Sequence, residues 1–319
     1  MQIRIMMLLS DEKNKRLCRC AETILEEVAG SFGHSFSIRY EKIGAESRKM
    51  YGEALTEETV VACLACKGVV ADSIHAEGMD ELLDALETDL CMRNVMLPQK
   101  GGASGAEVWL ATVRALDDES IRKGAEFAFR AAEKMALPVY HIAPSGKARE
   151  NWLSSVGSIA KDHAYVSHAA LEADTAMEMM LKTPGEMGVV LMPPYAGRIF
   201  QAAANALCVD PYMMHAAMPG KENGVYAACY QREDDEVALS PVAMVMAVSN
   251  MLRFSAGLEK EADCVDAAVQ NVLAAGWRTP DMPLIDEDQV ITPEDMADLI
   301  CEQISLAGQL LYDGKGVIL

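Results

Sequence analysis

The stretch QIRIMMLL, residues 2–9, is an apolar run of strand length, and the segments that follow it decide the fold class. Residues 11–31 place apolar side chains at helical spacing on one face, and residues 35–43 alternate like a strand. Thr56 offers a hydroxyl N-cap to another helix, and residues 67–71 form a further short apolar run. This order of strand, helix, strand, helix and strand predicts a doubly wound α/β sheet with helices on its faces.

The alternation of elements continues to the end of the chain. The sequence predicts helices over residues 80–89, 119–135, 154–163, 171–181, 199–207, 241–254, 261–275 and 292–311, and strands over residues 108–113, 137–142 and 188–192. A chain of 319 residues suits two domains or one large two-lobed domain. Residues 97–105, rich in Pro, Gly and Ser, are therefore expected to form a hinge between two lobes.

The charge balance argues against several classes of partner. The chain holds 28 Lys and Arg against 48 Asp and Glu, which gives a formal net charge of −20. Nucleic acids and anionic membrane surfaces attract basic faces, so we expect neither as a partner. No apolar run reaches the roughly 18 residues of a membrane span and no signal peptide is expected, so the predicted location is cytoplasmic.

The nine cysteines show no framework of paired spacings. Cys63 and Cys66 form a CxxC motif, but they fall inside a helical pattern and lack a second pair at zinc spacing. We interpret the cysteines as small buried hydrophobes of a protein from a reducing compartment.

The common catalytic and phosphate-binding motifs are absent from the sequence. No Gly-x-Gly-x-x-Gly fingerprint follows the first strand, and no Gly-x-Ser-x-Gly elbow occurs. Residues 100–105, KGGASG, do not form a Walker loop, because the lysine precedes the glycines. His163 and His168 are five residues apart and do not share a helix face, and nothing orients His141 with Ser145 as base and nucleophile.

Five stretches, in the same order as in one family, are more informative. They are residues 55–63 (LTEETVVAC), 188–200 (GVVLMPPYAGRIF), 240–244 (SPVAM), 251–254 (MLRF) and 274–281 (AAGWRTPD). These stretches resemble LPEETLEAC, the strand and TPNLFGDILSDEAA turn, NPIA, MLRH and GYRTPDL of the decarboxylating β-hydroxyacid dehydrogenases, the family of isocitrate and isopropylmalate dehydrogenases. The resemblance covers nearly the whole chain, and the shared order and spacing carry it.

The resemblance implies a two-lobed, isopropylmalate-dehydrogenase-like α/β fold with mixed sheets flanked by helices. Residues 1–97 and 209–319 are then expected to form the larger, discontinuous lobe. Residues 98–208 are expected to form the smaller lobe, which in the family carries the dimerisation side.

The same resemblance implies that the family reaction would need NAD or NADP and a Mg²⁺ or Mn²⁺ ion held by carboxylates. Two metal-binding aspartates of the family correspond to Arg198 and Ala202 here, and only the third position keeps a carboxylate, Asp174. The family's catalytic lysine has no counterpart, since Lys147 is displaced from its position. The resemblance therefore assigns no catalytic residue and no complete metal site to this chain.

Arginines that bind substrate carboxylates in the family are better matched. Arg114 occupies one such position, and Arg93 stands slightly before another. Together with Arg198 they predict an anion-binding cleft for a small carboxylate. The family insertion after Arg114, which holds a catalytic tyrosine and an arm that clasps the partner subunit, is missing, so a homodimer is expected but weakened.

The family's adenine-binding loop corresponds to residues 228–241 of this chain. The segment is shorter and carries the acidic run Glu233–Glu236, whose charge would repel a pyrophosphate. Binding of NAD in the family's manner is therefore expected to be weak or lost.

These features favour a divergent isocitrate/isopropylmalate dehydrogenase-like protein that lacks the metal-dependent oxidative decarboxylation and binds a small carboxylate. Two alternatives stay open. One is an active NAD(P)-dependent oxidoreductase that acts on a 2-hydroxy (di)acid through an altered site. The other is a non-catalytic partner subunit of an active paralogue.

Overall fold

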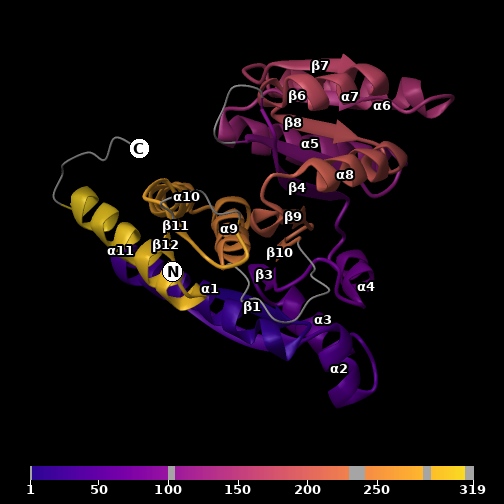
Figure 1. Cartoon of the computed structure of the whole chain (residues 1–319). Helices are drawn as coiled ribbons and strands as arrows, with labels where there is room; N and C mark the ends of the chain where they lie inside the picture. Colours follow the sequence, from indigo (N-terminus) through magenta and orange to yellow (C-terminus); the bar gives the residue numbers. More distant parts are fainter. Residues whose placement is uncertain (1, 100–104, 230–240, 283–288, 313–319) are drawn as a thin grey trace. The chain divides into compact units, whose positions relative to one another are not determined.

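The chain divides into two compact units in the computed structural model, which describes residues 2–99, 105–229, 241–282 and 289–312 (Figure 1). Unit 1 consists of Met1–Glu87 together with Gly220–Leu319, and unit 2 consists of Thr88–Pro219. The chain therefore passes from unit 1 into unit 2 and back again.

Unit 1 alternates strands and helices in its N-terminal part and is mainly helical in its C-terminal part. Its elements are β1 (Gln2–Leu9), η1 (Glu12–Asn14), α1 (Lys15–Phe32), β2 (Ser35–Lys42), α2 (Gly44–Tyr51), α3 (Glu57–Leu64), β3 (Gly68–Ala71), α4 (Met79–Ala85), β10 (Gly224–Ala228), α9 (Val242–Met251), the π-helical turn η4 (Leu252–Ala256), α10 (Glu259–Ala274), β11 (Trp277–Arg278), β12 (Gln289–Val290) and α11 (Pro293–Tyr312). Strands β2, β1, β3 and β10 lie side by side in this order, and all three pairings are parallel.

The elements of unit 1 form because each one buries the apolar face that its sequence provides. The apolar run of β1 is buried from Ile5 to Leu9. The apolar face of α1, which includes Ile24 and Leu25, is fully buried, and α1 packs against α9 and α11. Thr56 caps α3 as predicted, since its hydroxyl oxygen accepts from the backbone N–H of Thr59 at 3.1 Å.

An ion network centred on the buried Arg253 joins the end of α9 to α10. Arg253, in η4, is 6 % exposed, and its guanidinium donates to Asp263 and Asp266 at 2.5 and 2.6 Å. Ser249 donates to the other carboxylate oxygen of Asp266 at 2.5 Å. Burial raises the pKa of Asp266, and Arg253 opposes that rise.

Unit 2 is built around a mixed sheet. Its elements are β4 (Leu90–Leu97), β5 (Ala106–Val113), α5 (Asp118–Met135), β6 (Val139–Ile142), α6 (Ala148–Asp162), β7 (His168–Leu171), α7 (Ala173–Lys182), η2 (Pro184–Glu186), β8 (Val189–Met192), α8 (Pro194–Leu207), η3 (Pro211–Met213) and β9 (His215–Pro219). The strand order is β9-β4-β5-β8-β6-β7. Strands β5, β8, β6 and β7 are parallel, whereas β4 is antiparallel to both β5 and β9.

Different helices cover the two faces of this sheet. A Cβ on Gly124 of α5 would meet Val113 and Leu90, so α5 covers the face on which these two side chains project. A Cβ on Gly197 of α8 would meet Thr112, which precedes Val113 in β5 and projects to the opposite face. Helices α5 and α8 therefore lie on opposite sides of β5. Among the described residues, no helix is both long and apolar enough to cross a membrane.

Two expectations from the sequence differ from the structure. The crossing between lobes that was expected at residues 97–105 is not found there, because Leu97 ends β4 and pairs with Ala106, the first residue of the antiparallel strand β5, inside unit 2; residues 100–104 themselves lie outside the described residues. The units also change at Glu87–Thr88 and Pro219–Gly220, whereas boundaries were expected at 97/98 and 208/209. The reason is that β4 and β9 pair with each other inside unit 2.

Candidate functional site

Four parallel strands of unit 2 end in one row. Thr112 of β5 pairs with Met192 of β8, and Ile142 of β6 pairs with Leu171 of β7. Strands β6 and β8 are in register as well, so the carboxyl ends of β5, β8, β6 and β7 meet at one edge. Neighbouring strands lie about 4.8 Å apart, and sites of α/β sheets form outside this kind of edge. We call it the carboxyl edge of unit 2.

Arg114 follows β5 directly at this edge. Its backbone N–H donates to the carbonyl oxygen of Asp89 at 2.8 Å, and Nη1 of its guanidinium donates to the carbonyl oxygen of Thr88 at 3.2 Å. The side chain is half-buried. Helix α5 starts at Asp118, so the connection after Arg114 is short. These contacts hold the guanidinium of Arg114 at the carboxyl edge.

Helix α8 starts at the same edge and lies very close to β5. A Cβ on Gly197 would lie 2.3 Å from Cγ2 of Thr112, so only glycine allows this approach. One turn further along the helix, Nε2 of Gln201 donates to Oγ1 of Thr112 at 3.3 Å. The start of α8 is therefore held against the end of β5.

The first turns of α8 are electropositive. Pro193 provides no side-chain cap, and the first turn contains no acidic residue, so the positive end of the helix dipole is not neutralised. Arg198 is exposed on the next turn, and it makes no hydrogen bond or ion pair with any residue that the structure describes. Tyr195, 78 % exposed, lies beside it on the solvent side. A helix start that carries a cation in this way attracts anions.

Asp174 lies in the first turn of α7, after β7, and it is exposed. Its Oδ1 accepts from the backbone N–H of Thr175 at 2.7 Å and from the hydroxyl of Thr175 at 3.4 Å. β7 lies two strands from β8, about 10 Å, and no ion pair joins Asp174 to Arg198 within the described chain.

The carboxylate positions do not fit a divalent cation in this chain. No group of three or more His, Cys, Asp or Glu side chains is placed to hold a metal ion in the ranges that the structure describes. Arg198 and Ala202, the two positions on α8 that the sequence resemblance compares with metal ligands, carry exposed side chains. Mg²⁺ and Mn²⁺ require several oxygen ligands, and Asp174 alone does not supply them.

Arg93 lies further from the edge than the other predicted arginines. It sits inside β4 opposite Leu110, on the same face of the sheet as Thr112, which α8 covers. Three positions separate it from the end of the strand, where Leu90 pairs with Val113, and they correspond to roughly 10 Å. The structure thus brings Arg114 and the start of α8 to the carboxyl edge. The backbone of Arg93 lies further inside the sheet, away from that edge.

No lysine stands at the end of β6. His141 in β6 is buried, and its Nδ1 accepts from Nε1 of Trp152 on α6 at 3.3 Å. Burial lowers the pKa of His141 to about 4, so the ring is neutral near pH 7. Lys147 and Ser145 are exposed in the loop before α6. His141 is therefore part of the packed core beneath α6.

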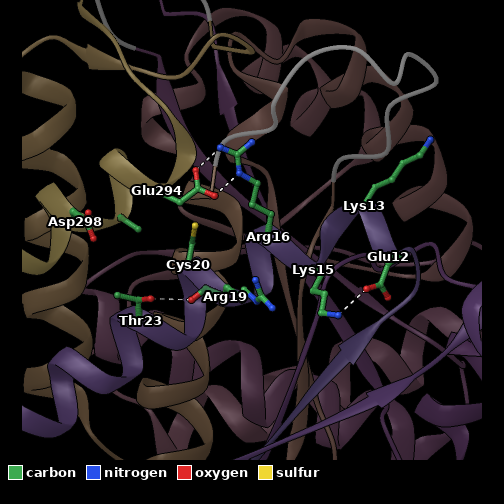
Figure 2. A pocket seen from close by; sticks show the side chains of 10 residues that line it. Glu12, Lys13, Lys15, Arg16, Arg19, Cys20, Thr23, Glu294 and Asp298 are labelled. Carbon is green, nitrogen blue, oxygen red and sulfur yellow. Dashed lines mark hydrogen bonds and ion pairs between the residues drawn. The ribbon is translucent and has the colours of Figure 1, made fainter.

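A pocket of about 530 Å³ lies in unit 1, lined by residues from the start of α1 and the start of α11 (Figure 2). Figure 2 shows Arg16 directed at Glu294 and Lys15 directed at Glu12, and each forms an ion pair. None of the site residues predicted from the sequence lines this pocket.

Two residues that determine how α8 meets β5, Thr112 and Gln201, were not predicted from the sequence. The available signal was Gly197, because a glycine inside a predicted helical region indicates a close packing partner. The identity of that partner depends on the strand order, which the sequence pattern does not contain.

Known proteins match this architecture and its motifs. A profile of the isocitrate/isopropylmalate dehydrogenases matches residues 98–300, most of unit 2 together with part of unit 1. The chain therefore belongs to the isocitrate/isopropylmalate dehydrogenase family, as its motifs predict. It is similar to the 3-isopropylmalate dehydrogenases of Oleidesulfovibrio alaskensis, at 24 % identity over 88 % of this chain and 94 % of the relative, and of Thermotoga maritima, at 22 % over 95 % and 99 %.

Solved structures confirm the predicted fold. The β-decarboxylating dehydrogenase of Thermococcus kodakarensis in its apo form superimposes with a TM-score of 0.82 at 15 % identity, covering 99 % of this chain and 100 % of that one. The isocitrate dehydrogenase of Methylococcus capsulatus gives a TM-score of 0.77 at 15 % identity, covering 95 % and 99 %. The α/β fold of this dehydrogenase family is therefore present along the chain.

Proposed function

We propose that this family member binds a small carboxylate at the carboxyl edge of unit 2 without a divalent cation, and that it lacks the family's metal-dependent oxidative decarboxylation. One observation carries the proposal. Arg114 and the uncapped start of α8, which bears Arg198, lie at one edge of the sheet, while Asp174 belongs to no group of three or more metal-ligating side chains among the described residues.

The chemistry of this edge suits a carboxylate. A guanidinium presents N–H groups in a fork that matches two carboxylate oxygens, and free N–H groups at a helix start add further donors. Because the chain carries a net charge of −20, such a concentration of positive charge is a local exception. Arg93 is proposed to add charge from beneath α8, since its backbone lies behind the edge.

The proposal includes a homodimer that lacks the family's clasping arm. Helix α5 begins at Asp118, immediately after the short connection that starts at Arg114, so no inserted arm leaves the sheet at this point. The acidic run Glu233–Glu236, which the proposal takes as unfavourable to NAD(P), lies outside the described residues.

The alternative is an active NAD(P)-dependent dehydrogenase that uses Mg²⁺ or Mn²⁺ and acts on a 2-hydroxy (di)acid. It is favoured by the alignment with 3-isopropylmalate dehydrogenases over nearly their full length. In that case the metal site at Asp174 would need further ligands from another subunit or from the residues outside the described ranges.

Thermal shift and calorimetry with the full-length chain distinguish the two. The probes are malate, citrate and tricarballylate, each with and without EDTA, and then NAD, NADP and Mg²⁺ or Mn²⁺. We expect a carboxylate to stabilise the protein equally well in EDTA. Stabilisation that requires both a nucleotide and a metal, together with reduction of NAD or NADP, would refute the proposal and support the alternative.

A charge reversal tests the assignment of Arg198. Arg198→Asp should weaken carboxylate binding by roughly thirtyfold or more, because a charge-assisted contact worth about 2 kcal/mol becomes a repulsion. Arg122→Asp is the matched control, since it changes the charge equally on an exposed position of α5, which covers the other face. Equal effects of the two variants would show that net charge alone is responsible and remove Arg198 from the site.

A further inference from the structure

The parallel sheet of unit 1 has a carboxyl edge of its own, and a buried carboxylate lies there. The strand order β2-β1-β3-β10 places β2 and β3 on opposite sides of β1. The crevice between the carboxyl ends of β1 and β3 is therefore a topological switch point, the position at which doubly wound proteins bind nucleotides and other phosphates. Asp72 directly follows β3 and lies in this crevice.

Asp72 occupies the hydrogen-bond donors that a phosphate would use there. The backbone N–H of Ser10 donates to both oxygens of the Asp72 carboxylate, at 3.0 and 2.9 Å, and the N–H of Asp11 donates at 3.3 Å. Nδ2 of Asn14 adds a further bond at 3.1 Å. All these donors belong to the turn between β1 and α1, the segment that holds the glycine-rich fingerprint in dinucleotide-binding proteins. A carboxylate from the same chain thus takes the place of a ligand anion.

The crevice is close to solvent and next to a basic segment. Asp72 is 3 % exposed, whereas Ser10 and Asn14 are only half-buried. Four basic residues follow within a short stretch and line the pocket of Figure 2; they are Lys13, Lys15, Arg16 and Arg19. Burial raises the pKa of Asp72, and the hydrogen bonds from Ser10 and Asn14 oppose that rise.

We propose that Asp72 is an internal anion that closes the switch-point crevice of unit 1 and thereby excludes phosphate ligands from it. The device concerns unit 1 alone and does not rest on the carboxylate site proposed in unit 2. Either proposal can fail while the other stands, because the tests use different variants and different anions.

Chemical rescue of Asp72→Ala tests this role. The substitution removes the carboxylate and leaves the N–H groups of Ser10 and Asp11 without an acceptor, so we expect the melting temperature of the full-length variant to fall by several degrees. Inorganic phosphate, compared with chloride at equal ionic strength, should raise it again. Formate, which replaces the deleted carboxylate, should do the same, and the wild type should gain no such increment from either anion.

Asp72→Asn is the matched control, because its side chain fills the crevice without the charge. It should be destabilised as well, but phosphate and formate should not restore its stability. If Asp72→Ala does not fold in chloride, the readout becomes its refolding yield in phosphate against chloride, with Asp72→Ser as a second variant. An equal phosphate effect in the wild type, Asp72→Ala and Asp72→Asn, or an equal yield in both salts, would overturn the proposal.

Discussion

Substitution of Gly197 by alanine is the sharpest test of how α8 is seated on the sheet. The new Cβ would lie 2.3 Å from Cγ2, 2.4 Å from Oγ1 and 2.9 Å from Cβ of Thr112. Ordinary contacts between such atoms begin near 3.4 Å, so the start of α8 has to retreat from β5 by roughly 1 Å. The retreat also lengthens the hydrogen bond from Gln201 to Thr112.

The magnitude follows from two opposing effects. Overpacking of this kind costs about 1–3 kcal/mol, and alanine in a helix gains about 0.5–1 kcal/mol over glycine. We therefore expect Gly197→Ala to lower the free energy of unfolding by about 1–2 kcal/mol. If the carboxylate site is where we propose, the affinity for the carboxylate should fall as well, because Arg198 moves with the helix.

Urea unfolding followed by circular dichroism measures the first effect. Gly157→Ala in α6 is the matched control: nothing lies within 4 Å of the added Cβ, so this variant should be stabilised. In a Thr112→Ala background the two closest overlaps are removed, and the cost of Gly197→Ala should shrink accordingly. A Gly197→Ala protein that is as stable as Gly157→Ala would refute the close approach of α8 to β5.

Three further predictions concern stability. Arg253→Ala should cost about 1–3 kcal/mol in urea unfolding, because it leaves the half-buried carboxylate of Asp266 without its cation. Burial lowers the pKa of His215 to about 4, so the unfolded chain binds a proton first as the pH falls, and this group should remove up to about 3 kcal/mol of stability between pH 6.5 and 4. His215→Asn should remove this share of the drop and leave the similar share of His141, whereas the exposed His168→Gln should change neither. Thr56→Ala should cost about 1 kcal/mol at the start of α3, measured as a shift in the urea midpoint.

Elements with a strong internal pattern were predictable from the sequence. β1 and α1 carry their apolar residues at the period of their own secondary structure, so the buried face can be recognised without knowing its partner. β9 and β10 give no such signal. Their sequences, HAAMP and GVYAA, are short and rich in alanine, and each pairs with a strand that is distant in the sequence, β9 with β4 and β10 with β3.

The candidate site shows the same division. Arg114 and Arg198 were proposed as site residues from the family resemblance, because each lies in or beside a stretch that the chain shares with the family. The distance of Arg93 from the edge could not be predicted, because it depends on the register of β4 against β5. The sequence of one strand does not specify its register against another. The hinge expected at residues 97–105 failed for a related reason: Pro, Gly and Ser mark a turn between two strands as readily as a crossing between lobes.

The proposed replacement of a metal-ligand position by Arg198 also limits what the proposed site can do with its ligand. A guanidinium carries only N–H donors, so it can hold a carboxylate by hydrogen bonds and charge. A divalent cation additionally coordinates a hydroxyl oxygen and stabilises the negative charge that develops on it during reaction. An arginine in this position binds the ground state and contributes little that is specific to a transition state, and only the second kind of contact accelerates a reaction. The proposed function therefore requires binding without turnover. A variant with aspartates at positions 198 and 202 should lose its affinity for the small carboxylate in EDTA and should instead bind the carboxylate only in the presence of Mg²⁺.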